Sequence, residues 1–293
     1  MVRKITVIGA GSTGHAVASV MSQRGFEVTF HDDERFASRF QDIEELGGIT
    51  LRGGMHGTGK PVCMTTDPEK AVRGAEVIFV HVKAEVTTGV PLNLKGKVAS
   101  LPASDTARVL KDLEGVVEYT ANRNVFEGVI NAGNVINHIA STVLSAAEID
   151  HKGHDYSLFQ YAFTPRVVHC VGKIREERKA VIEAMGMTEH GNPMGMIEKV
   201  LHLDEHPEVH IFYKYMDGPF ALDHRYLHED CGCGGAFALS VAEHLGMDMP
   251  VLRSFLGVAG AINDRDYIHG GRTLENLGFP KDMPLEEIYK AIE

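Results

Sequence analysis

The hydrophobic pattern changes its period partway along the chain, and each part predicts a different architecture. In the first part, continuous apolar runs at 4–8 and 75–82 predict strands of a parallel sheet that is covered on both faces. In the second part, apolar residues recur at helical spacing, and the stretch at 126–149 predicts one long helix. We therefore expect an α/β Rossmann-type domain over residues 1–125 and an all-helical domain over residues 126–293.

The expected sheet is shorter than such a domain usually has. Only 14 residues, 83–96, separate the strand at 75–82 from the next candidate strand at 97–101. A parallel crossover needs about a dozen residues or more, so one crossover fits in that gap and two do not. A helix at 104–115 and a strand at 116–121 follow, and the prediction is a truncated parallel sheet.

A glycine-rich loop joins the first strand to the first helix, in the order strand, GxGxxG, helix. Gly9 permits a tight turn, Gly11 lets the backbone approach a pyrophosphate, and Gly14 lets the helix pack closely on the strand. The start of the helix adds N–H groups that are free to bind an anion. The sequence therefore predicts a dinucleotide site formed by Gly9, Ala10, Gly11, Ser12, Thr13 and Gly14.

An acidic residue follows the second predicted strand, FEVTFHD, and bears on which dinucleotide is bound. Asp32 lies 18 residues after Gly14, where a carboxylate can accept hydrogen bonds from the adenosine ribose and would repel a 2′-phosphate. This favours NAD as the cofactor. Asp33 and Arg35 lie close enough to leave NADP possible.

Net charge and cysteine content narrow the class of protein. The chain has 29 Lys and Arg against 40 Asp and Glu, a formal charge of −11, so we expect no nucleic-acid partner. Its four cysteines form no paired CxxC units, which predicts free thiols in a reducing cytoplasm and no metal site. The apolar run at the N-terminus is short and ends in the glycine loop, and no segment reaches membrane-spanning length. We expect a cytoplasmic protein without a membrane partner.

Titratable side chains are concentrated in DHRYLHED, residues 223–230, in an otherwise apolar neighbourhood. Other distinctive stretches occur in a fixed order around it: GITLRGGMHGTGKPVCMTTDPEKAVRGAEVIFV, PASDTARVL, NVINHIASTVLSAAEI and, at 271–278, GRTLENLG. With these motifs the sequence resembles the octopine/nopaline (opine) dehydrogenase family over most of its length.

The resemblance implies a fold, an activity and three functional side chains. It implies a nucleotide-binding domain joined to an all-helical domain, and an NAD(P)H-dependent condensation of an amino acid with an α-keto acid in the cleft between them. By the family motif, His138 is the proton donor and acceptor, and Asp230 holds and polarises it. By the same motif, Arg225 resembles the family arginine that binds an anion, either a cofactor phosphate or a substrate carboxylate.

These residue types suit the implied roles. A histidine titrates near neutral pH, and a neighbouring carboxylate fixes its tautomer. An arginine fork matches the carboxylate that every α-keto acid and amino acid carries. A structural salt bridge between Arg225 and Asp230 is the alternative. We interpret His224, His228 and Glu229 as solvated neighbours.

Two departures from the family pattern leave other functions open. The segment that usually lines the nicotinamide is replaced by KAEVTTGVPLNL, and Ile139 follows His138 where the family usually has proline. One alternative is an NAD-dependent dehydrogenase of a 2-keto or 2-hydroxy acid. Another is a dinucleotide-binding protein without turnover. The sequence does not indicate which amine is used, and a small sheet with an exposed edge favours a homodimer.

Overall fold

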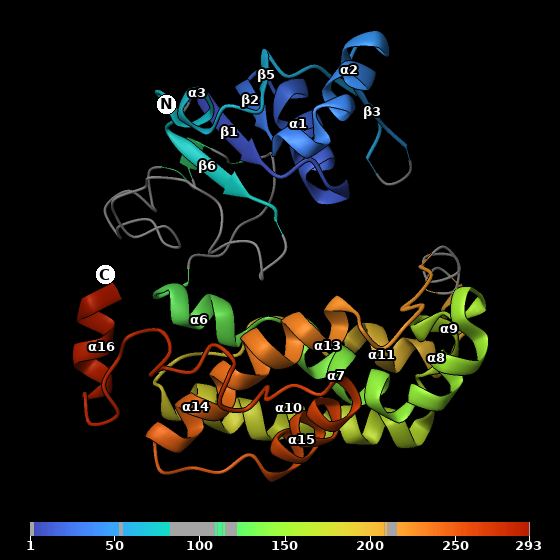
Figure 1. The fold of residues 1–293 in the computed structure, drawn as a ribbon, viewed down its shortest axis with the longest axis vertical. Coiled ribbons are helices and arrows are strands. Elements are labelled where there is room, and N and C mark those ends of the chain that lie inside the picture. Colours follow the sequence, from blue (N-terminus) through green and yellow to red (C-terminus); the bar gives the residue numbers. More distant parts are fainter. Residues whose placement is uncertain are drawn as a thin grey trace. The chain divides into compact units, whose positions relative to one another are not determined.

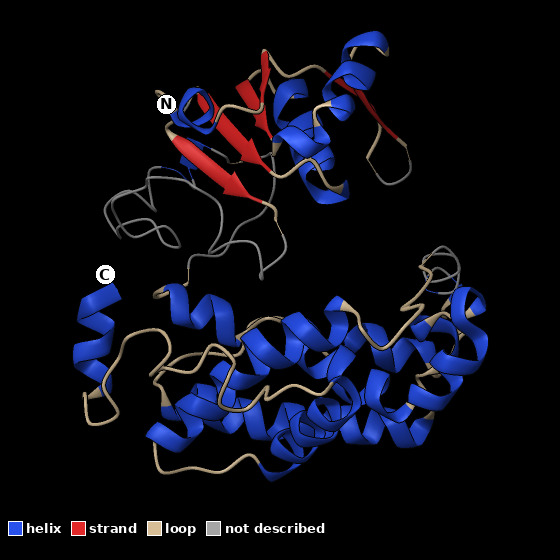
Figure 2. Cartoon of the chain, viewed as in Figure 1, coloured by secondary structure: helices blue, strands red, loops and turns tan. Residues whose placement is uncertain are grey.

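The computed structural model describes residues 3–52, 55–82, 109, 111–112, 114, 122–207, 209 and 216–292. The chain divides into two compact units, Met1–Ala121 and Asn122–Glu293 (Figure 1). Each unit has its own hydrophobic core. The described strands all lie in the N-terminal unit, together with several helices, and the other unit is built of helices (Figure 2).

A parallel sheet forms the centre of the N-terminal unit. Its described strands are ordered β5-β2-β1-β6, and every neighbouring pair is parallel. The bounds are β1(Lys4–Ile8), β2(Glu27–His31), β5(Cys63–Thr65) and β6(Val77–Val80). The predictions of strands at 4–8, 26–32 and 75–82 are therefore confirmed. The strands predicted at 97–101 and 116–121 lie outside the described residues, and of the helix predicted at 104–115 the structure describes residues 109, 111, 112 and 114, the first three of them helical.

Short helices and a hairpin surround this sheet. They are α1(Ser12–Gln23), η1(Glu34–Phe36), α2(Ser38–Glu45), α3(Pro68–Val72) and the antiparallel strands β3(Ile49–Leu51) and β4(Gly57–Gly59). Helix α1 lies against β1, β2 and the hairpin. Val7, Val28 and Phe30 are completely buried beneath it, as the continuous apolar runs require.

The second unit is all-helical among its described residues, apart from one isolated bridge between Ser157 and Gly218. Its helices are α6(Val125–Ile130), α7(Asn134–Leu144), α8(Ala146–Lys152), η2(Gly153–Asp155), α9(Leu158–Tyr161), α10(Pro165–Ala184), α11(Gly195–Val200), α13(Arg225–Glu229), the π-helical turn η3(Asp230–Gly235), α14(Ala236–His244), α15(Pro250–Asn263) and α16(Leu285–Ile292). The predicted fold class, a Rossmann-type domain followed by an all-helical domain, is confirmed.

The single helix expected at 126–149 is wrong, because the segment forms α6, α7 and α8. The first break falls at residues 131–133, and its cause lies elsewhere in the chain. Arg178 of α10 donates from Nη1 to the carbonyl of Ala132 at 2.8 Å, and the Asn131 side chain donates to the carbonyl of Thr188 at 3.1 Å. These distant groups hold the backbone in a loop where the sequence pattern alone continues the helix.

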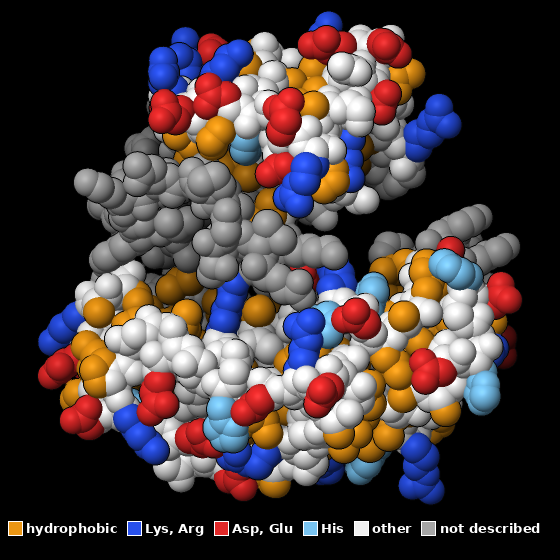
Figure 3. Space-filling model, viewed as in Figure 1, with side chains coloured by type: hydrophobic (Ala, Val, Ile, Leu, Met, Phe, Trp, Pro, Cys, Tyr) orange, Lys and Arg blue, Asp and Glu red, His pale blue; other side chains and the backbone are white. Residues whose placement is uncertain are grey.

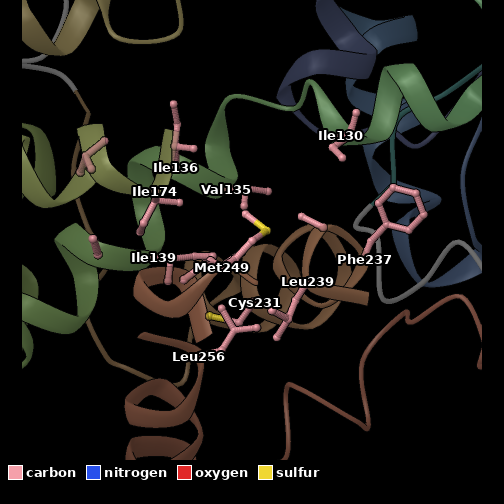
Figure 4. Packing of buried hydrophobic residues seen from close by; sticks show 14 of the residues in the cluster. Ile130, Val135, Ile136, Ile139, Ile174, Cys231, Phe237, Leu239, Met249 and Leu256 are labelled. Carbon is pink, nitrogen blue, oxygen red and sulfur yellow. The ribbon is translucent and has the colours of Figure 1, made fainter. Parts of the chain in front are cut away.

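Helix α7 is the central element of the helical core. It packs on α10, α13, α15 and η3. Ile136 and Ile139 are completely buried there, and Figure 4 shows them among Ile174 of α10, Cys231 of η3 and Leu256 of α15. This packing fixes the position of α7, and with it the backbone of the residues on α7 that do not face the apolar core.

On the surface, acidic and basic side chains are interspersed over the face shown in Figure 3. Among the described helices, none combines the length and the apolar character needed to cross a membrane.

Candidate active site

The glycine loop begins where β1 ends, and three of its glycines meet different surroundings. Gly9 has φ +99, and a Cβ there would lie 2.4 Å from the carbonyl oxygen of His81. A Cβ on Gly14 would lie 1.8 Å from the carbonyl oxygen of Gly9. A Cβ on Gly11 would meet no atom of the described residues within 4 Å. The first two glycines thus serve the turn and its packing, and Gly11 leaves space beside the backbone.

The start of α1 is suited to binding an anion. Gly11 occupies the N-cap position, and no side chain of the described residues caps the helix. The first N–H groups of a helix have no partner within it, and the helix dipole favours negative charge at this end. Gly11, Ser12 and Thr13 are exposed, whereas Ala10 and Gly14 are buried. These residues fit the pyrophosphate of a dinucleotide.

Asp32, the predicted ribose ligand, lies directly after β2 and holds the glycine loop. Its Oδ2 accepts the N–H of Ala10 at 2.7 Å, and its Oδ1 accepts the N–H of Asp33 at 2.8 Å. Arg39 lies 3.5 Å from Asp32 Oδ2 and donates to the carbonyl of Ala10 at 2.8 Å. Each carboxylate oxygen has a second lone pair, so Asp32 retains acceptor capacity for a ribose hydroxyl.

In the helical unit, the structure brings His138 and Asp230 together. His138 Nδ1 on α7 lies 2.7 Å from Asp230 Oδ2 at the start of η3, and the imidazole side chain is 7% exposed. One face of the imidazole lies on the ring of Tyr226, with 3.7 Å between centroids and 20° between planes. Phe159 approaches edge-on at 6.2 Å.

The π-helical turn places Asp230 close to α7 because its residues are small. A Cβ on Gly234 would lie 2.2 Å from Val135 Cγ2, and one on Gly235 would lie 3.3 Å from Ile139 Cδ1. Val135 and Ile139 flank His138 on α7. The small-residue segment CGCGG, residues 231–235, is thus the contact surface that lets the two backbones approach.

Arg225 is not joined to the other two predicted residues by a contact among the described atoms. Its Nε lies 3.3 Å from Glu229 Oε2, four residues later on α13, and its side chain is 45% exposed. The alternative salt bridge between Arg225 and Asp230 is not formed in the described part of the chain. The guanidinium is partly accessible and has donors left for a second anion.

His228 is not the solvated neighbour that we expected. Its side chain is 9% exposed; Nε2 pairs with Asp223, and Nδ1 lies 2.6 Å from the hydroxyl of Tyr267. Asn263 at the end of α15 donates to the same hydroxyl at 3.1 Å. These contacts fasten α13 to the segment after α15, which fixes the helix that carries Arg225 and Tyr226.

Tyr226 is the site residue that sequence reasoning missed. The spacing to Asp230 was the available signal, because residues four apart lie on the same side of a helix. A tyrosine and an aspartate at that spacing can therefore contact the same partner. Among the described residues, no group of three or more His, Cys, Asp or Glu side chains is arranged to hold a metal ion.

Comparison with known proteins finds two family models that overlap and together span residues 4–263. Residues 4–148 match the N-terminus of NAD-dependent glycerol-3-phosphate dehydrogenase, and residues 121–263 match the alpha-helical domain of NAD/NADP octopine/nopaline dehydrogenase. An opine dehydrogenase of Arthrobacter sp. (strain 1C) is 25% identical over 342 aligned positions, which cover 93% of this chain and 94% of the relative. Because the chain itself has 293 residues, that relative has segments that this chain lacks.

Two solved structures show that the whole fold is shared. An octopine dehydrogenase in complex with NADH and agmatine superposes with a TM-score of 0.68 at 16% identity, covering 99% of this chain and 98% of that chain. A ketopantoate reductase of the PanE/ApbA family from Ralstonia eutropha JMP134 gives a TM-score of 0.54 at 16% identity, covering 89% and 98%. The helical unit thus matches the model of the octopine/nopaline dehydrogenase family, and the chain is similar to an opine dehydrogenase over nearly its whole length.

Proposed function

We propose that this protein is an opine-type dehydrogenase, which uses NADH to condense an amino acid with an α-keto acid. The observation that carries the proposal is the pair of His138 and Asp230, 2.7 Å apart, within the matched helical domain. The relative in Arthrobacter is named an opine dehydrogenase, and it aligns with nearly the whole chain. The octopine dehydrogenase with the same fold was solved with NADH.

The reaction needs one hydride and one proton at the same carbon–nitrogen bond. The amine nitrogen replaces the carbonyl oxygen of the keto acid, which leaves as water, and the C=N bond is then reduced. A bound reduced nicotinamide supplies the hydride. The protein's own task is to hold the reactants and to move the protons.

His138 moves the proton through Nε2. Asp230 accepts the Nδ1–H at 2.7 Å, which leaves the lone pair of the neutral ring on Nε2. The hydrogen bond of the His138 ring among the described residues is made by Nδ1, which leaves Nε2 for the substrate. A neutral His138 takes a proton from the incoming amine, and the protonated ring returns it to the departing oxygen or to the product nitrogen.

Arg225 binds a carboxylate or a phosphate. Its side chain is 45% exposed, and its Nε lies 3.3 Å from Glu229 Oε2. Both substrates of the proposed reaction carry a carboxylate, and the planar guanidinium matches it with two parallel hydrogen bonds. The substrates that this site accepts are therefore small anionic molecules.

Residues 9–14 and Asp32 bind the dinucleotide. The uncapped start of α1 takes the pyrophosphate, and Asp32 takes a hydroxyl of the adenosine ribose. The carboxylate favours NADH. Arg39 lies 3.5 Å from Asp32 with its side chain 41% exposed, which keeps NADPH as a possible second cofactor because a guanidinium can pair with the 2′-phosphate.

Reduction of a keto acid without an amine is the second candidate. The ketopantoate reductase shares the fold at a TM-score of 0.54, and a fold does not determine its chemistry. The same His138–Asp230 pair would protonate the alkoxide oxygen formed when a hydride reaches a ketone. An amine requirement separates the two candidates.

The test is NADH oxidation by the purified protein with pyruvate and other α-keto acids, each with and without a pool of amino acids. Turnover that needs both an α-keto acid and an amino acid supports the opine reaction. Turnover with the α-keto acid alone supports the second candidate. His138→Gln is the control, because a glutamine keeps polarity and cannot exchange the proton. If the protein binds NADH but shows no turnover, both candidate reactions are overturned, and the protein binds a dinucleotide without catalysis.

We also propose a cytoplasmic homodimer. The four cysteines, all of them described, are free thiols, as expected in a reducing compartment. The described sheet has a three-residue strand, β5, at one edge, which a second chain could cover. Light scattering at several protein concentrations tests the dimer, and a constant monomer mass would contradict it.

A further inference from the structure

The ring of Tyr226 lies flat on the imidazole of His138, and neither the motif roles nor the proposed chemistry uses it. The centroids are 3.7 Å apart and the planes differ by 20°. We propose that Tyr226 is a positioning residue, whose aromatic face fixes the plane of the His138 ring so that Nε2 stays directed at the substrate. The proposal rests on the proposed function for its catalytic consequence, although its structural part can be tested without turnover.

A hydrogen bond at Nδ1 is not enough to fix an imidazole. The ring can still tilt about an axis that runs through Cγ and Nδ1, because such a rotation keeps the 2.7 Å contact between Nδ1 and Asp230. A flat contact over the whole face of the ring resists this tilt. Phe159 adds an edge contact at 6.2 Å with planes at 78°. With these contacts, the direction of Nε2 is determined by the protein before the substrate arrives.

The two restraints on His138 come from one turn of the chain. Tyr226 lies on α13 and Asp230 follows at the start of η3, four residues later. Residues at that spacing share one side of a helix, so α13 presents a ring and a carboxylate to the same imidazole. A displacement of α13 would move both contacts together, which keeps their relative geometry constant.

Tyr226 is itself held in place. Its backbone N–H is directed at His224 Nδ1 at 3.3 Å, and the His224 ring lies edge-on to the phenol at 4.6 Å and 89°. The support of α13 by His228 and Tyr267 continues this restraint. Burial raises the pKa of Tyr226; the charge of Arg225 lowers it and that of Asp230 adds to the rise. The phenol therefore stays neutral at physiological pH, and the face of the ring is what His138 meets.

The first arm of the test compares turnover of variants that keep or remove the ring. Tyr226→Phe keeps the face and loses the hydroxyl, whereas Tyr226→Leu and Tyr226→Met fill space without a ring. We expect Tyr226→Phe to retain kcat within about threefold, and the other two to lose about ten- to a hundredfold in kcat with little change in KM. Tyr161→Leu, at an exposed tyrosine of the same unit, is the matched control and keeps its activity.

The second arm reads His138 directly and needs no substrate. In protein with ¹⁵N-labelled histidine, His138→Gln identifies the signals of His138 by their disappearance. We expect sharp ring signals of a single orientation in the wild type and Tyr226→Phe, and broadened or doubled ring signals in Tyr226→Leu and Tyr226→Met, because a tilting ring exchanges between orientations while Asp230 keeps the proton on Nδ1. A wild type without turnover would overturn the proposed function and leave this arm decisive.

Two results would overturn the positioning role. If Tyr226→Leu and Tyr226→Met show the His138 signals of the wild type, the ring does not fix the imidazole. If Tyr226→Phe loses as much kcat as Tyr226→Leu, the hydroxyl acts on the substrate and the face does not matter. Thermal unfolding of each variant identifies a misfolded protein, and Tyr226→Met serves where Tyr226→Leu fails to fold.

Discussion

The two candidate sites are constructed in different ways. The proposed dinucleotide site uses the backbone of six consecutive residues, 9–14, where a side chain on Gly9 or Gly14 would collide with the backbone. The proposed proton-transfer site uses the side chains of His138 and Asp230, which are 92 positions apart and meet because α7 packs on η3. Backbone sites tolerate most changes of side chain and fail when space is lost. Side-chain sites fail when one functional group is lost.

The largest expected effect comes from removing one functional group of the side-chain site. His138→Gln should lower kcat by about a thousandfold, which corresponds to roughly 4 kcal/mol of lost transition-state stabilisation. The affinity for NADH should not change, because the backbone site is intact. Stopped-flow turnover and a fluorescence titration with NADH measure the two quantities.

Asp230→Asn tests whether Asp230 and His138 act together, by its effect on kcat alone and in combination with His138→Gln. Because Asp230 acts through His138, the double variant should lose little more than His138→Gln alone, as residues that act as a unit are not additive. Losses in kcat that add fully would contradict the pair, and an equal loss in NADH affinity would contradict the separation of the two sites.

The next effect concerns the ion pairs that hold the loop before α7. Glu189 pairs with Arg175 at 2.7 Å and with Arg178 at 3.2 Å, and the Arg178 side chain is 1% exposed. Glu189→Gln leaves this guanidinium buried with one partner fewer, and we expect a loss of about 3 kcal/mol in unfolding free energy. Glu183→Gln, at an exposed pair with Lys179, is the control and should cost less than about 0.5 kcal/mol.

The same comparison has a defined pH dependence. Burial tends to raise the pKa of Glu189, but the hydrogen bonds from Arg175 and Arg178 outweigh it, and the net pKa is lowered from the ordinary value of 4.5. A lowered pKa in the folded state adds stability above the unfolded value and loses it as pH falls through the folded value. The gap between wild type and Glu189→Gln should thus be constant above pH 4.5 and shrink below it. A gap independent of pH down to acid unfolding would refute this.

Sequence information was sufficient where structure is local. The strand, glycine loop and helix at 4–23 follow from consecutive residues, and so does Asp32 after the second strand. Gly128 and Gly133 weaken the helical pattern before α7, but the contact that holds the break between α6 and α7 could not be predicted, because it comes from Arg178, 46 positions beyond Ala132. The partnership of His138 with Asp230 was available only through the family resemblance, since no periodicity relates the two positions.

A smaller effect compares the glycines of the two units. Gly234→Ala would place a Cβ 2.2 Å from Val135 Cγ2, and overpacking of this kind costs about 1–3 kcal/mol. Because that neighbour is a side chain, Val135→Ala should recover much of the loss in the double variant. At Gly14 the neighbour is the carbonyl oxygen of Gly9 at 1.8 Å, and no second side-chain substitution can remove it. Denaturant unfolding of the single and double variants measures the difference. If the double variant loses as much unfolding free energy as the two single variants lose together, the two side chains do not clash directly.

The smallest expected effect is a change of cofactor preference through Asp32, the one side chain that we assign to the backbone site. Its oxygens already accept the N–H groups of Ala10 and Asp33, so Asp32→Asn keeps one of these acceptors and removes the negative charge. We expect the preference for NADH over NADPH to fall by about tenfold, or roughly 1.4 kcal/mol, since Arg39 then faces the 2′-position without an opposing carboxylate. Arg39→Gln in the same background should restore the preference for NADH. If the ratio of kcat/KM with NADH to kcat/KM with NADPH is equal in all three proteins, Asp32 only holds the glycine loop. The site would then bind its cofactor without distinguishing a ribose hydroxyl from a 2′-phosphate.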